Sequence, residues 1–196
     1  MNAALRRPMT ADEFLAWEEG QEAKHEFDGF GPVAMTGVTR AHAIVQGDLI
    51  ASLGARLRGG PCRVFGSDLK IEADASIRYP DAFVTCTAGP NASTVVHDLG
   101  RNGVSPEVVV FEILGPGTAK TDRITENREH RATPSIRRYV MLEQDEIAAT
   151  VFERAGETDE DWIGHILAAD AVLRLPEIGV ELPLAEPYDG FDPAAG

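Results

Sequence analysis

The sequence predicts a mixed α/β fold, with helices packed against a central β-sheet. Three observations predict it: capped helix patterns open the chain, an apolar strand pattern occupies residues 107–114, and shorter strand patterns separated by turn residues surround it. With 196 residues, the chain is expected to form one domain, 1–196. Its ordered core is expected over about 9–188, followed by a loose tail, 189–196.

The first half of the chain combines two helix patterns with short strands. Thr10 and Glu13 have the spacing of a capping box, which predicts a helix over residues 10–21. A second helix is expected over 39–58, because its apolar residues recur at helical spacing and a Gly-Gly-Pro sequence ends it. The strands expected in this half cover residues 24–27, 32–35, 62–65, 68–73 and 79–86.

The second half consists mainly of strands. Residues 107–114 are almost wholly apolar and β-branched, so this strand is expected to be central and buried on both faces. A loop-rich crossing is expected before it, over 87–106, and a polar helix after it, over 118–133. Further strands are expected over 136–142, 148–154 and 162–167, with residues 182–184 packed back on the core.

Composition limits the class of protein. The net charge is −14, which argues against a general nucleic-acid binder unless a local basic patch is present. Residues 1–7 lack the apolar core of a signal peptide, and no apolar run is long enough to span a membrane. Cys62 and Cys86 form no metal-binding pattern and are expected as reduced, buried thiols. We therefore expect a cytoplasmic protein with no membrane partner.

Two carboxylates stand in or beside the apolar strands. Glu112 lies within 107–114, and Asp81 follows Pro80, which marks the start of a strand. A buried carboxylate is destabilising unless it is paired, and a divalent metal ion is a frequent partner. The two acids therefore predict a divalent-metal site, although each alone could instead cap a turn or pair with an arginine.

Several motifs, in order along the chain, resemble the Uma2 family of restriction endonucleases, once labelled DUF820. They occupy residues 9–18, 24–29, 32–35, 39–42, 64–70, 79–81, 111–118 and 133–140. The resemblance extends over nearly the whole chain. It implies the PD-(D/E)xK nuclease superfamily, with a restriction-endonuclease-like central mixed sheet flanked by helices. It also implies hydrolysis of phosphodiester bonds at an acidic site for Mg²⁺ or Mn²⁺.

The resemblance assigns roles to three acids. Asp81 matches the Pro-Asp motif, Glu112 the second acid and Glu26 the upstream acid, so all three are expected to be catalytic and to bind the metal. Carboxylate oxygens suit a hard cation, which can acidify bound water and offset charge on the phosphate. Two alternatives remain: Glu26 could pair with Lys24, and His42 is expected to be packed near the sheet rather than to act as a ligand.

The chain departs from the family pattern close to these acids. The superfamily lysine two positions after Glu112 is Leu114. The lysine that the family places on the next helix is Glu126, and a tyrosine four residues on is His130. Glu126 is therefore either a lost lysine or an added metal ligand. The residues that could supply the missing charge are Lys120, Arg123 and Lys70.

Two functions follow from this reading. The first is a metal-dependent DNA endonuclease, and the second is a catalytically impaired nuclease-fold protein that acts as a binding or assembly module. The residues expected to contact DNA are Arg137, Arg138, Lys120 and Arg123. The alternative is an ordinary solvated helix face with ion pairs along it. Related folds often dimerise, so a homodimer is a further expectation.

Overall fold

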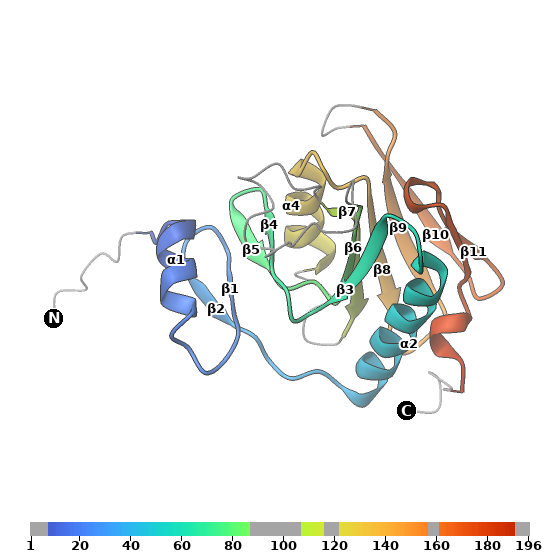
Figure 1. Cartoon of the computed structure of the whole chain (residues 1–196), viewed down its shortest axis with the longest axis horizontal. Helices are drawn as coiled ribbons and strands as arrows, with labels where there is room; N and C mark the ends of the chain where they lie inside the picture. Colours follow the sequence, from blue (N-terminus) through green and yellow to red (C-terminus); the bar gives the residue numbers. More distant parts are fainter. Residues whose placement is uncertain (1–7, 87–106, 116–121, 157–160, 191–196) are drawn as a thin grey trace, which may run out of the picture.

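The computed structural model describes residues 8–86, 107–115, 122–156 and 161–190. Its centre is a six-stranded sheet in the order β10-β9-β8-β7-β6-β3 (Figure 1). The strands are β3 (Cys62–Gly66), β6 (Ala82–Cys86), β7 (Glu107–Leu114), β8 (Arg138–Glu143), β9 (Ala149–Arg154) and β10 (Trp162–Leu167). Only β7 and β8 run parallel among these neighbours. The expected mixed α/β fold with a central mixed sheet is therefore confirmed.

The central strand β7 has both faces covered, as its apolar sequence predicts. Val109, Phe111 and Ile113 pack in the cluster that includes the apolar side of α2 (Arg40–Leu57). Val110 and Leu114 pack in a second cluster on the opposite face. Because successive side chains of a strand alternate between faces, Glu112 belongs to the same face as Val110 and Leu114.

A smaller sheet, in the order β2-β1-β5-β4, lies beside the large one with α1 (Ala11–Glu18) packed on it (Figure 1). Its strands are β1 (His25–Phe27), β2 (Pro32–Ala34), β4 (Ile71–Ala73) and β5 (Ser76–Arg78). The reciprocal hydrogen bonds of the capping box between Thr10 and Glu13 are present. Phe14, Phe27 and Ile77 form the core between α1 and this sheet.

The two strands expected over 68–73 and 79–86 are present but shorter than predicted, and the strand between them was not predicted. Strand structure begins only at Ile71, and β6 begins only at Ala82. Between them the chain makes a tight turn at Asp74, whose φ is 55°, and returns as β5. Aspartate tolerates this left-handed conformation better than most residues. The unpredicted strand β5 brings Arg78 to the site described below.

Among the described residues after β7, a π-helix, η2 (Asp122–Glu126), is followed directly by α4 (Asn127–Ala132). The expected helix over 118–133 is thus present from residue 122, and 118–121 lie outside the described residues. The expected crossing over 87–106 lies outside them as well. The predicted strand pair after α4 is confirmed as β8 and β9.

The C-terminal part forms a hairpin of β11 (Val172–Leu175) and β12 (Val180–Pro183). Two 3-10 helices accompany it, η3 (Pro176–Ile178) and η4 (Glu186–Tyr188). Leu182 and Leu184 are fully buried against the α2 cluster, which confirms that this segment packs back on the core. The expected tail from 189 lies outside the described residues beyond 190.

The two cysteines are not free thiols, so that expectation was wrong. Cys62 and Cys86 form a disulfide that joins β3 to β6. The two residues face each other across the antiparallel pair, with their Cα atoms 4.0 Å apart. Their spacing of 24 residues in the sequence gives no sign of this pairing. Among the described helices, none is long and apolar enough to cross a membrane.

Candidate metal centre

Asp81 and Glu112 come together where β6 begins beside β7. Ala82 pairs with Phe111 across the two strands, so residues 81 and 112 lie at the same level. The Ile113 amide donates to Asp81 Oδ2 at 2.7 Å, and the Asp81 amide donates to Glu112 Oε2 at 3.3 Å. Backbone hydrogen bonds therefore fix both carboxylates, as a preorganised ligand pair requires.

His42 reaches this pair from α2. Its Nε2 lies 2.9 Å from Asp81 Oδ2, so this nitrogen carries the hydrogen that the carboxylate accepts. The ring is 6 % exposed, and its Nδ1 has no hydrogen-bond partner. His42 is packed near the sheet, as expected, but it also contacts the acid directly, which the sequence did not indicate.

Glu26, the third expected acid, enters from β1. Its Oε1 accepts from the Tyr79 amide at 3.0 Å, and its Oε2 accepts from Arg78 Nη1 at 3.0 Å. The alternative pairing with Lys24 is wrong, because Lys24 Nζ instead binds Asp68 Oδ1 at 2.6 Å. Glu26 is thus held beside Tyr79, two residues before Asp81.

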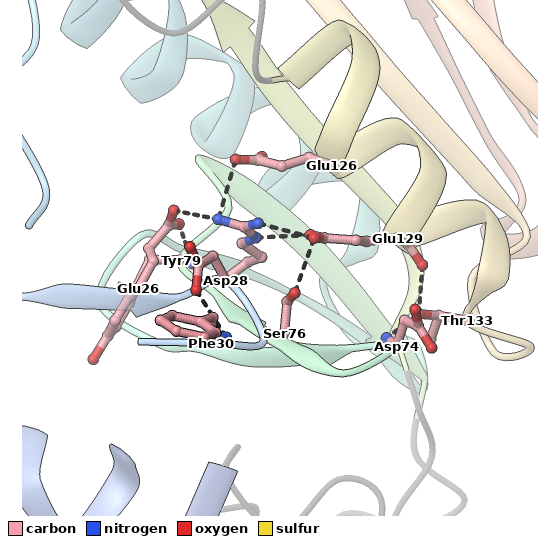
Figure 2. A network of polar contacts seen from close by, with 10 residues as sticks. Glu26, Asp28, Phe30, Asp74, Ser76, Tyr79, Glu126, Glu129 and Thr133 are labelled. Atoms are coloured by element: carbon pink, nitrogen blue, oxygen red, sulfur yellow. Dashed lines mark hydrogen bonds and ion pairs between the residues drawn. The ribbon is translucent and has the colours of Figure 1, made fainter. Parts of the chain in front are cut away.

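Arg78 is the residue of this site that sequence reasoning missed. Its side chain is 3 % exposed and makes a two-pronged ion pair with Glu129. Figure 2 shows Glu26, Glu126 and Glu129 converging from three elements around this guanidinium. Burial alone would lower the pKa of Arg78, but the Glu129 hydrogen bonds and the charges of Glu126 and Glu26 raise it overall. The guanidinium is therefore a permanent cation.

A cavity of about 470 Å³ joins these groups. Its lining includes all three expected acids together with His42, Arg78, Tyr79 and Glu126. Exposed apolar residues of the β2 region, Val33, Met35 and Val38, form another part of its wall. The three acids that the sequence selected therefore border one common space.

Negative charge predominates around this cavity. Among the described residues, six carboxylates lie at or next to it: Glu26, Asp28, Asp81, Glu112 and Glu126 are in its lining, and Glu129 is paired with Arg78. Arg78 is the one arginine or lysine among the described lining residues. Glu112, Glu126 and Glu129 are each less than 9 % exposed. Such an excess of buried negative charge is destabilising without further cations, and carboxylate oxygens are the ligands that a hard divalent ion prefers. The residues present therefore fit a metal ion.

Glu126 and His130 extend the acidic group inward. Glu126 Oε1 lies 3.8 Å from Arg78 Nη1. His130, on α4, is fully buried with its ring 4.8 Å from that of Tyr139. Burial, and the nearby charge of Arg78, lower the pKa of His130 to about 3, so the imidazole is neutral. Three possible ligand atoms, one each from Glu112, Glu126 and His130, all lie within 4.8 Å of one another.

The expected basic residues lie in different places. Lys70 binds Glu18 at 2.6 Å and is therefore committed elsewhere. Arg138 is buried and paired with Glu153 at 2.7 Å and Glu177 at 2.9 Å. Arg137 is exposed and hydrogen-bonded through its backbone to Val108, four positions before Glu112 on β7. The part of the chain that the structure describes does not include Lys120 or the side chain of Arg123.

The sequence model of one family, Uma2, described as "Putative restriction endonuclease", matches residues 11–185. The chain belongs to the Uma2 family. An uncharacterized protein of Synechocystis sp., slr1290, is 28 % identical over 185 residues, which cover 93 % of each chain. The family recognised from the sequence motifs is thereby confirmed.

A solved structure confirms the fold of this Uma2 protein. A crystal structure from Anabaena variabilis, titled as a putative nuclease belonging to DUF820, superimposes with a TM-score of 0.67. The match covers 96 % of this chain and 98 % of the other, at 16 % sequence identity. At this identity the likeness concerns the fold, and the roles of the individual acids rest on the geometry above.

Proposed function

We propose that this Uma2 protein is a divalent-metal-dependent nuclease that hydrolyses DNA phosphodiester bonds in the cavity bordered by Asp81, Glu112 and Glu26. The observation that carries the proposal is the pair of carboxylates on adjacent strands, held by the 2.7 Å and 3.3 Å backbone hydrogen bonds inside an acidic cavity. The family to which the chain belongs supports nuclease chemistry.

Asp81 and Glu112 would hold a Mg²⁺ or Mn²⁺ ion. When bound, such an ion supplies a more acidic water and offsets the charge that develops on the phosphate. His42 donates to Asp81 Oδ2 and so orients this carboxylate. Glu26 accepts hydrogen bonds from Arg78 and the Tyr79 amide, which fixes this wall of the cavity. From the cavity lining it would assist a second ion or orient a water.

The alternative, a nuclease fold that binds without cutting, is favoured by one observation. The guanidinium of Arg78 already contacts Glu26 and Glu129, so it is not available as the positive group that a lysine supplies in related sites. A phosphate entering the cavity would then meet an excess of carboxylates. Metal binding without cleavage is the result that this second function predicts.

The test is cleavage of supercoiled plasmid DNA with Mg²⁺ or Mn²⁺. Asp81→Asn keeps the shape and the hydrogen-bond acceptor but removes the charge, so we expect loss of nicking by a hundredfold or more. The matched control is Asp170→Asn, since Asp170 is exposed in the turn before β11, and its activity should equal that of the wild type. Equal cleavage by the Asp81→Asn variant would overturn the site.

Metal binding is measured separately by thermal unfolding. At a concentration 100 times the dissociation constant, Mn²⁺ should stabilise the wild type by about 2.7 kcal/mol, a rise in Tm of about 5–10 °C. The double change Asp81→Asn, Glu112→Gln should abolish this rise. A rise with no cleavage would select the binding or assembly module instead of the nuclease.

A further inference from the structure

His130 is a fully buried histidine with neither ring nitrogen hydrogen-bonded. Its exposure is 0 %, and both Nδ1 and Nε2 lack a partner. Leaving a buried polar group without a hydrogen bond is destabilising, so such a group in a native fold calls for an explanation. Packing against Tyr139 explains the position of the ring but not the two unused nitrogens.

Two buried carboxylates lie close to this ring. Ligand atoms of Glu112, Glu126 and His130 all lie within 4.8 Å of one another, and both carboxylates are more than nine-tenths buried. Bonds of about 2.0–2.2 Å to one ion place its ligand atoms roughly 3–4 Å apart. Small rotations of these side chains therefore suffice to close them around an ion.

The local backbone explains why the three groups meet. Glu126 and His130 stand four residues apart in a helical segment, a spacing that puts both side chains on one face. Glu112 lies on the face of β7 that bears Val110 and Leu114. Glu112 and Glu126 also line the cavity, so an ion could enter past them and reach His130 as its innermost ligand.

We propose that Glu112, Glu126 and His130 form a second cation site, for a transition-metal ion of the Zn²⁺ or Co²⁺ class rather than Mg²⁺. Imidazole nitrogen suits these ions, whereas Mg²⁺ prefers carboxylate, carbonyl and water oxygens. The site shares Glu112 with the proposed catalytic pair, but it uses neither Asp81 nor Glu26. It therefore stands whether or not the protein cleaves DNA.

The neighbouring guanidinium is compatible with this site. Arg78 Nη1 is 3.8 Å from Glu126 Oε1, which is longer than a hydrogen bond. This contact therefore leaves the Glu126 carboxylate within the same group of ligand atoms as Glu112 and His130. Arg78 keeps its shorter contacts, at 2.8 Å to Glu129 and 3.0 Å to Glu26. Because Glu129 precedes His130 on α4, the ion pair with Arg78 also holds the histidine in place.

The experiment titrates the metal-free full-length chain with Co²⁺, read by visible absorption, and with Zn²⁺ and Mg²⁺, read by calorimetry. We expect Co²⁺ and Zn²⁺ to bind at least tenfold more tightly than Mg²⁺ at this site. His130→Phe, which keeps a ring in the core, should weaken Co²⁺ binding tenfold or more and change its absorption spectrum. The matched control is His165→Phe, on exposed β10, which should bind as the wild type does.

Glu126→Gln is the second variant, and it should weaken Co²⁺ binding as strongly as His130→Phe. Its control is Glu72→Gln, an exposed carboxylate on β4. Asp81→Asn should retain Co²⁺ binding although it loses cleavage, which separates this site from the catalytic one. Unchanged Co²⁺ affinity and spectrum in folded His130→Phe, or in Glu126→Gln, would overturn the proposal.

Discussion

Arg78 and Glu129 form a two-pronged ion pair inside the protein, with Nε 2.8 Å from one carboxylate oxygen and Nη2 3.0 Å from the other. Ser76 donates a further hydrogen bond to the same carboxylate at 2.9 Å. The pair joins β5 of the small sheet to α4, and α4 carries His130. The ion pair therefore connects the small sheet, which carries Glu26, to α4, which carries His130.

Replacement of Arg78 by Met should strongly destabilise the protein. Breaking a buried ion pair costs about 3–5 kcal/mol, and this change leaves the carboxylates of Glu26 and Glu129 without their cation. Urea denaturation should show the loss as a lower midpoint at similar slope. The double variant Arg78→Met, Glu129→Gln should lose less than the two single variants together. Additive losses would show that the two side chains are not coupled.

The contacts of Glu18 predict a pH dependence. Burial would raise the pKa of this carboxyl, but hydrogen bonds from Lys70 and Tyr79, and the Lys70 charge, lower it below 4.5 overall. A carboxyl whose pKa is lowered by folding stabilises the protein above its unfolded pKa, and this stabilisation is lost as the pH falls through the folded pKa.

Glu18→Gln should therefore lower Tm at pH 7, by an amount that reflects about 1.5–3 kcal/mol for hydrogen bonds to a charged group. The difference from the wild type should shrink as the pH falls below about 4.5. Thermal unfolding from pH 7 to pH 3 measures it, with Glu72→Gln as a control on an exposed acid. A difference that stays constant over this range would contradict the assignment.

Glu126→Lys distinguishes a lost lysine from a metal ligand. The position lies in the cavity lining and 3.8 Å from Arg78, so an ammonium there would repel the guanidinium and remove a ligand. We expect at least tenfold weaker Co²⁺ binding and a lower Tm. If residue 126 were only a lost lysine, the change would instead raise plasmid cleavage by about a hundredfold. Measuring both quantities on one preparation decides between them.

Two neighbouring arginines, Arg137 just before β8 and Arg138 at its first position, should behave differently. Arg137 is exposed, so Arg137→Ala should weaken DNA binding and reduce the salt slope by about one at unchanged Tm. Arg138 is buried between Glu153 and Glu177, so Arg138→Ala should destabilise the fold by about 2 kcal/mol, between the values for buried and exposed pairs. Unchanged DNA binding in Arg137→Ala would place the contact surface elsewhere.

Much of the fold follows from local sequence patterns. The capping box of α1, the helical spacing in α2 and the apolar run of β7 each depend on residues close in the chain, and each is present. The turn at Asp74 was missed because it depends on one residue with φ of 55°. The strand β5 that follows this turn was therefore missed too.

The site was predictable only in part. Asp81 and Glu112 could be selected because strong apolar patterns surround them, and the family motifs pointed to Glu26. Arg78 was missed because its partners come from β1, η2 and α4, at distances in sequence that no local pattern connects. The disulfide of Cys62 and Cys86 was missed for the same reason, since it depends on the register of β3 against β6.

The π-helix η2 has a consequence for how this site can change in evolution. A π turn contains one residue more than an α turn, and it can lose that residue to become regular helix. Ile124, in the middle of η2, is 62 % exposed, so its deletion would remove little buried surface. Insertions and deletions can therefore accumulate here while α4 keeps His130 in place. Among homologues, we expect the number of residues in η2 to vary more than the number of residues in α4.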